Sequence, residues 1–133
     1  MIRKDPIKKY LVLLGRVFYS AIFILASFGH STAKTINFAA SQGVLFANIL
    51  VPFSGLLALF GGLSILLGYK ARCGAWLLVI FLVPVTYMMH KFWTISNPIM
   101  HDMQQAMFMK NTALLGAALL ITHFGSGPLS LKK

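Results

Sequence analysis

The polar residues of this sequence that could perform chemistry concentrate in one stretch, residues 86–111. It contains two of the four histidines, one of the two acidic residues and two of the twelve Lys and Arg residues. The rest of the chain consists mainly of apolar runs. The imidazole, amide and ammonium groups of this stretch therefore indicate a site for a polar ligand or for proton transfer. The candidate binding residues of this stretch are His90, Trp93, His101, Asp102, Lys110 and Asn111.

His90 and Trp93 are three residues apart, so on a continuous helix they would share a face. His90 could bind a polar group or carry a proton, because imidazole changes its charge near neutral pH. Trp93 could stack on the ring of a ligand, or it could anchor a helix end at the membrane interface, as tryptophan commonly does.

His101 and Asp102 are adjacent, and adjacent residues do not face each other on a helix. We therefore expect each of them to pair with a group elsewhere in the bundle, either Lys91, Lys110 or His30. His30 follows the first apolar run and is a further candidate for the same cluster.

Two charged residues, Arg16 and Lys110, interrupt apolar runs. A charge near the bilayer centre costs about 2.5–3.5 kcal/mol on insertion scales, so each of them needs a physical explanation. Arg16 could extend to the inner head groups, or it could contact an anion or a quinone carbonyl inside the bundle. Lys110 could anchor its helix at the interface, or it could form a polar inner face with the neighbouring Asn111.

The methionines offer an alternative that involves a metal. Met100, Met103 and Met107 fall on one helical face near His101, and thioether and imidazole groups together are ligands for Cu(I). Methionine is also a flexible filler of apolar cores, and no thiolate accompanies this group, so we expect no metal site. The single cysteine, Cys73, excludes an intrachain disulfide and a CxxC redox pair.

The composition is that of a membrane protein. Of 133 residues, 58% are hydrophobic and only 11% are charged, against about 25% charged in soluble domains. The net charge of +10 lies at the ends of apolar runs and forms no patch, which argues against nucleic acid as a partner. No phosphate-binding loop, zinc signature or catalytic triad is apparent. We expect an all-α integral membrane protein in which residues 1–133 form a single domain.

Four apolar runs predict four transmembrane helices that pack as a bundle. Small residues at Ser54, Ala58 and Gly61 or Gly62 predict a face of close helix approach in the second run, and Gly116 with Ala117 predict another in the fourth. The predicted helices cover about residues 11–29, 44–67, 73–90 and 105–124.

Lys and Arg residues predict the orientation of the bundle. They are frequent near the N-terminus, at Lys70 and Arg72, and in the tail, whereas the two opposite connections contain only Lys34 and Lys91. Because positive residues favour the cytoplasmic side, both termini are expected in the cytoplasm of a bacterial inner membrane. Residues 86–111 would then face outward.

Several segments resemble the DoxX family of small four-helix membrane proteins. The resemblance rests on LLGRVFYSAIFILASFGH, LVPFSGLLALFGGLSILLGYKAR, HKFW, QQAMFMKNTALLGAALL and GSGPLSL. The family takes its name from a membrane subunit of a thiosulfate:quinone oxidoreductase. The resemblance implies that the polar positions of the family are Arg16, His90, Trp93, Lys110 and Asn111.

The expected function is therefore that of a membrane subunit associated with a quinone-linked or redox-stress oxidoreductase. It would bind a quinone or a small oxidised-sulfur anion at the outer end of the bundle, with no cofactor of its own and with a membrane or periplasmic redox partner. A scaffold or assembly partner without catalytic activity, and a carrier of small molecules or copper, are the alternatives. Whether the chain is an enzyme stays open, and a homo-oligomer is compatible with its size.

Overall fold

The computed structural model describes residues 6–132, and these residues are almost entirely helical. Four helices are long and apolar enough to cross a membrane, which confirms the expected all-α membrane architecture. The elements in chain order are α1 (Pro6–Gly29), α2 (Ala33–Ser41), α3 (Ala47–Leu67), α4 (Ala71–Met89), the 3-10 turn η1 (Phe92–Thr94) and α5 (Pro98–Phe124).

Local capping explains two differences from the sequence expectation. The segment expected as the first loop contains α2, because the Thr32 side chain accepts a hydrogen bond from the Thr35 amide at 3.3 Å. The last helix begins at Pro98, seven residues before the expected residue 105. Asn97 caps this helix by accepting hydrogen bonds from the Ile99 and Met100 amides, and proline suits the first helical position.

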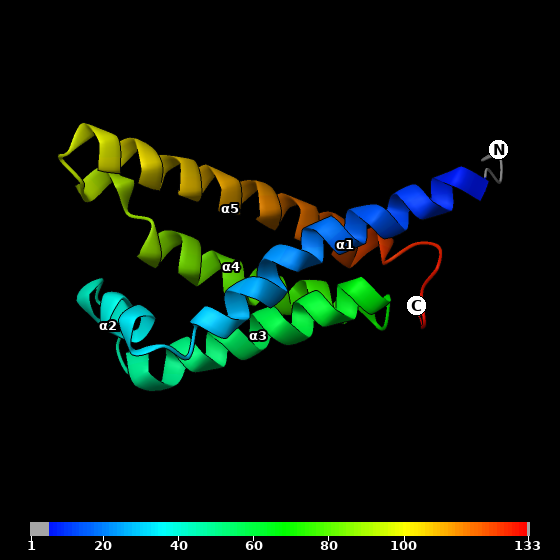
Figure 1. The fold of residues 1–133 in the computed structure, drawn as a ribbon, viewed down its shortest axis with the longest axis horizontal. Helices are drawn as coiled ribbons and strands as arrows, with labels where there is room; N and C mark the ends of the chain where they lie inside the picture. The colour runs from blue at the N-terminus through cyan, green and yellow to red at the C-terminus, as the bar shows by residue number, and fades with distance from the viewer. Residues whose placement is uncertain (1–5, 133) are drawn as a thin grey trace.

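The four long helices are held together at one end and spread apart at the other. α3 packs against both α1 and α4, and α4 packs in turn against α5. About halfway along both helices, α1 also meets α5, where the Tyr19 hydroxyl donates to the Leu114 carbonyl at 2.6 Å (Figure 1). Towards the other end α5 and α3 diverge, and α2 lies beside α3 there.

Glycines on α3 and α4 allow the closest helix approach. A Cβ atom at Gly61 would lie 2.9 Å from the Gly74 carbonyl oxygen, and one at Gly74 would collide with the Ser64 side chain. This confirms the small-residue face expected on the second apolar run. The prediction of a second close-approach face on the fourth run is wrong at Gly116, where an added Cβ would meet no atom within 4 Å.

The buried charge of α1 holds the C-terminal tail. Arg16 is only 6% exposed, and its Nη1 donates to the carbonyls of Ser126 and Pro128 at 3.0 and 2.9 Å. Its Nη2 donates to the Leu129 carbonyl at 2.7 Å. The tail therefore takes the place of the head groups or the anion that the sequence suggested as partners of this residue.

We expect Gly74→Ala to destabilise the protein and Gly116→Ala to have no such effect. The added methyl at Gly74 meets Ser64, and overpacking of this kind costs about 1–3 kcal/mol. Thermal unfolding in detergent, monitored by circular dichroism, measures the difference. Equal melting temperatures for the two variants would contradict the close approach of α3 and α4.

Arg16→Ala is expected to release the C-terminal tail, because several carbonyls lose a charged donor worth on the order of 2 kcal/mol each. Carboxypeptidase digestion of the purified protein should then shorten the variant much faster than the wild type. Lys8→Ala, an exposed cation on the same helix, is the matched control. Equal digestion of all three proteins would show that Arg16 does not hold the tail.

Candidate functional site

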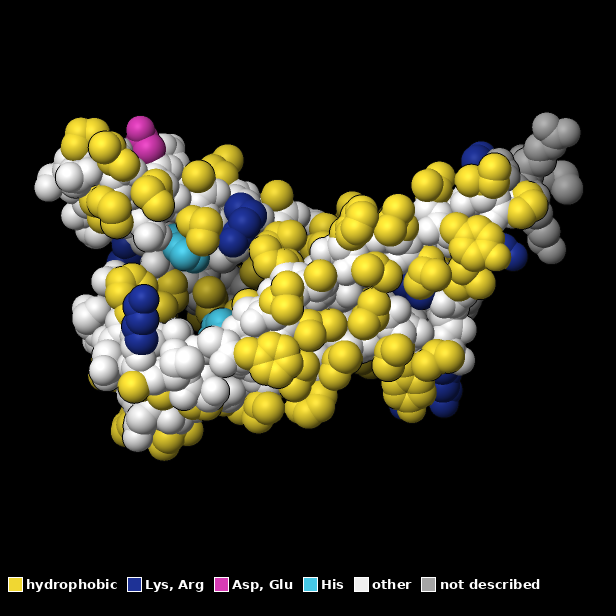
Figure 2. Space-filling model, in the orientation of Figure 1, with side chains coloured by type: hydrophobic (Ala, Val, Ile, Leu, Met, Phe, Trp, Pro, Cys, Tyr) yellow, Lys and Arg dark blue, Asp and Glu magenta, His cyan; other side chains and the backbone are white. Residues whose placement is uncertain are grey.

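A cavity of about 490 Å³ lies where the helices diverge. All four long helices and α2 contribute to its walls, and Figure 2 shows the hollow with cationic and histidine side chains at its edges. Its deeper walls are apolar and come from different helices: Phe23 from α1, Leu57 from α3, Phe81 and Leu82 from α4, and Leu114 from α5.

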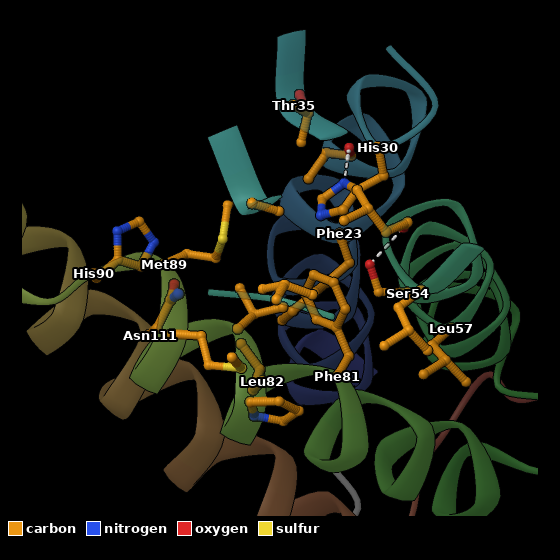
Figure 3. A pocket seen from close by; sticks show the side chains of 18 of the residues that line it. Phe23, His30, Thr35, Ser54, Leu57, Phe81, Leu82, Met89, His90 and Asn111 are labelled. Carbon is orange, nitrogen blue, oxygen red and sulfur yellow. Dashed lines mark hydrogen bonds between the residues drawn. The ribbon is translucent and has the colours of Figure 1, made fainter. Parts of the chain in front are cut away.

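One wall of the cavity, formed by the end of α4 and by α5, carries polar side chains. His90 Nδ1 lies 2.7 Å from Gln104 Oε1, and this hydrogen bond joins the end of α4 to the second turn of α5. Because an amide oxygen only accepts, His90 Nδ1 is the donor. Lys110 and Asn111 line the same wall, and Figure 3 shows His90 and Asn111 on one side of the cavity.

Asn111 is the least satisfied polar group of this wall. Its side chain is only 6% exposed and lines the cavity, yet it forms no hydrogen bond with any of residues 6–132. Within residues 6–132, the fully enclosed polar side-chain atoms without a partner are Arg16 Nε and Thr86 Oγ1, so the Asn111 amide atoms are not sealed off but open to the cavity. The Asn111 amide is therefore available to a molecule that occupies the cavity.

Lys110 lies deeper in the bundle than the sequence suggested. Because α5 begins at Pro98, Lys110 lies about 18 Å along the helix axis from its start. It lies about 9 Å deeper than Gln104, which is level with the end of α4. Lys110 Nζ approaches the Met107 sulfur at 3.8 Å, and a thioether is a weak acceptor.

His30 lies on the opposite wall of the cavity. Its Nδ1 is 2.8 Å from the Ala26 carbonyl oxygen, and its ring packs against Phe81 with 5.5 Å between the ring centres. Since a carbonyl oxygen only accepts, Nδ1 carries the hydrogen, and in the neutral ring Nε2 is left as an acceptor. Figure 3 shows His30 and Ser54 across the cavity from Asn111.

The structure therefore brings together four of the eight predicted site residues, namely His30, His90, Lys110 and Asn111. The other four lie outside the cavity. Arg16 holds the tail near the opposite end of the bundle, and Trp93, His101 and Asp102 lie in or beside the connection between α4 and α5.

Two expectations about these outer residues are wrong. α4 ends at Met89 and Trp93 belongs to η1, so His90 and Trp93 do not share a helical face. Trp93 packs against Tyr87 and Phe108 instead, with ring centres 5.6 and 5.9 Å apart. His101 and Asp102 do pair with each other, since Nδ1 and Oδ1 are 3.3 Å apart.

The alternative metal site receives no support from the arrangement. Met100, Met103 and Met107 are exposed on α5 and are not part of the cavity wall. Within residues 6–132, no three His, Cys, Asp or Glu side chains are placed to hold a metal ion.

Sequence reasoning missed Gln104 as the partner of His90. A signal was present, because Gln104 and Asn111 are seven residues apart, or two helical turns, and so share a face. Finding it required knowing that the helix already begins at Pro98.

The SURF4 family model matches residues 1–133, the whole of the sequence. The chain belongs to the SURF4 family. It is 29% identical over 124 residues to the inner membrane protein YqjF of Escherichia coli strain K12, which covers 92% of this chain and 89% of YqjF. It is 24% identical over 129 residues to the ER-derived vesicles protein ERV29 of Saccharomyces cerevisiae, covering 97% of this chain. The chain spans only 35% of the length of ERV29. No solved structure matches the chain.

The SURF4 match corrects the resemblance to the DoxX family, which is wrong as a family assignment. Most of the segments that suggested it are rich in Leu, Gly and Ala, a composition that membrane helices of unrelated families share, and HKFW is only four residues long. The expected quinone-linked oxidoreductase function rested on that resemblance and is wrong with it. Without membership of the DoxX family, the expected quinone and the expected redox partner have no support.

Proposed function

We propose that this SURF4 family protein binds a small amphipathic ligand in the cavity between its diverging helices. The observation that carries the proposal is Asn111, which is only 6% exposed and whose amide has no hydrogen-bond partner within residues 6–132, on the polar wall of a cavity whose deeper walls are apolar. A ligand with one polar end and an apolar body would satisfy the amide and fill the space between the apolar walls.

The size of the cavity supports a small ligand. Sites for small molecules measure about 300–1,000 Å³, and the volume of about 490 Å³ falls within this range. A transmembrane helix of a partner protein, about 30 Å long and 10 Å wide, would need on the order of 2,000 Å³. The cavity therefore suits a single flexible chain better than it suits a helix.

The surroundings support entry of the ligand from the membrane. The helices that form the cavity are those long and apolar enough to cross a bilayer, and the hollow opens between them (Figure 2). A ligand dissolved in the lipid would reach the cavity sideways without crossing water. We propose that the polar end of the ligand binds at the wall formed by the end of α4 and by α5, where His90, Lys110 and Asn111 lie.

The proposed location is a bacterial inner membrane, with both termini in the cytoplasm. The name of YqjF places that relative in an inner membrane, and the start of α1 lies at the same end of this bundle as the described part of the tail (Figure 1). The excess of Lys and Arg at this end, compared with the opposite end, supports its cytoplasmic placement. The cavity then opens in the outer half of the bilayer.

Ligand binding is tested with palmitate and palmityl alcohol that carry a photoreactive diazirine. The wild-type protein in phosphatidylcholine nanodiscs should be labelled at cavity residues, and mass spectrometry of the peptides locates the label. Ser54→Phe places a ring in the cavity and should lower labelling by roughly fivefold or more, because the ring displaces one or two ligand methylene groups, each worth about 0.8 kcal/mol when buried. Leu56→Phe, an exposed position on the same helix, should leave labelling unchanged.

Failure of both probes to label the cavity, or equal labelling of the two variants, would contradict the proposed function. Retention of the wild-type melting temperature by Ser54→Phe shows that reduced labelling does not result from unfolding.

Orientation is tested by labelling single cysteines with a membrane-impermeant maleimide. In a Cys73→Ser background, Lys34→Cys on α2 should react in intact spheroplasts, because the proposal places α2 outside. Lys132→Cys in the tail should react only after the cells are lysed. The reverse pattern would show that the termini face outward.

A further inference from the structure

We propose that the ligand of this cavity is a single-chain carboxylate, whose head group binds Lys110 and Asn111. This inference rests on the proposed function, and it further specifies the charge of the ligand and the number of its acyl chains. It follows from the charge balance of the cavity, from the unused hydrogen-bonding capacity of its wall and from its volume.

The cavity wall carries a cation without a counter-charge. No acidic residue lines the cavity, and the only acid within residues 6–132, Asp102, pairs with the adjacent His101. Lys110 is half-buried, forms no ion pair in this part of the chain, and has the Met107 sulfur at 3.8 Å as its one side-chain hydrogen-bond partner there. An ammonium group among apolar helices is costly unless an anion accompanies it, so a ligand anion would supply what the protein lacks.

Asn111 adds a directional contact beside that charge. Asn111 is 6% exposed, its amide is unpaired within the described residues and lines the cavity, and the amide nitrogen can donate two hydrogen bonds to a carboxylate. Adjacent residues on a helix point in different directions, yet both Lys110 and Asn111 line the cavity. A carboxylate placed there would accept a charge-assisted hydrogen bond from Lys110 and an amide hydrogen bond from Asn111.

The charge of the cavity wall and the volume of the cavity favour one class of anionic amphiphile over others. Among residues 6–132, Lys110 is the only Lys or Arg that lines the cavity, which matches a ligand with a single negative charge. A phosphate monoester carries about −1.5 to −2 charges at pH 7 and would be only partly neutralised. A phospholipid brings two acyl chains, whereas a cavity of about 490 Å³ suits one.

The apolar wall continues below the head-group position. Leu114 lies one helical turn deeper than Asn111 on α5, and Phe23, Leu57 and Leu82 come from the other three long helices at the cavity wall. The acyl chain would lie against these residues. The hydrogen-bonded pair of His90 and Gln104 would lie on the other side of the carboxylate, nearer the start of α5.

The test is a competition experiment in phosphatidylcholine nanodiscs with the diazirine-bearing palmitate as the probe. Unlabelled palmitate, palmityl alcohol and palmityl phosphate are compared as competitors. Palmitate should compete roughly tenfold better than the alcohol with the wild type, as a charged hydrogen bond predicts. Lys110→Met should remove this preference, and Lys110→Arg should retain it.

Lys34→Met removes a cation from α2 that does not line the cavity, and this control should keep the preference for palmitate. Equal competition by the acid and the alcohol with the wild type, or an unchanged preference in Lys110→Met, would overturn the carboxylate while leaving the proposed binding function intact. Stronger competition by palmityl phosphate would also overturn it. Binding of none of the compounds would instead overturn the proposed function itself.

Discussion

The contact between Arg16 and the C-terminal tail ties together one end of the helix bundle. Its guanidinium donates to three tail carbonyls and to the Ser130 hydroxyl, while the tail backbone pairs with the turn between α3 and α4. Farther along the bundle, about halfway along both helices, Tyr19 joins α1 to α5. The helices are free to diverge only at the opposite end, and the cavity lies there. A buried charge far from the site thus belongs to the framework that shapes the site.

Polar groups inside the bundle fall into two kinds, because a lipid environment offers them no water. Arg16, Tyr19 and His90 have partners within the protein, and each partnership joins separate elements of the chain. Lys110 and Asn111 have no comparable partner and face the cavity. Arg16 Nε and the Thr86 hydroxyl are exceptions, since both atoms are buried and unpaired within the described residues and nothing in the structure explains them. The distinction between the two kinds locates the candidate site more sharply than residue type does.

The SURF4 assignment changes how the site is interpreted. The same histidine, lysine and asparagine that suggested a quinone site under the DoxX resemblance now line a cavity in a family with members in bacteria and yeast. Short apolar motifs could not separate the two families, because the requirement to cross a membrane imposes similar residues on both. A match over the whole chain does separate them.

The sequence by itself determined the membrane character, the number of long helices and the small-residue face of α3, because these depend on composition and on local periodicity. It also pointed to His30, His90, Lys110 and Asn111 as polar residues in unusual places. Tertiary structure decided which of the eight candidates share a site. The tail residues that accept hydrogen bonds from Arg16 are 110 or more residues away in the sequence. Gln104, the partner of His90, is 14 residues away across a helix break. Helical periodicity relates residues within one helix, so only the packing of separate helices could reveal such contacts and the cavity between them.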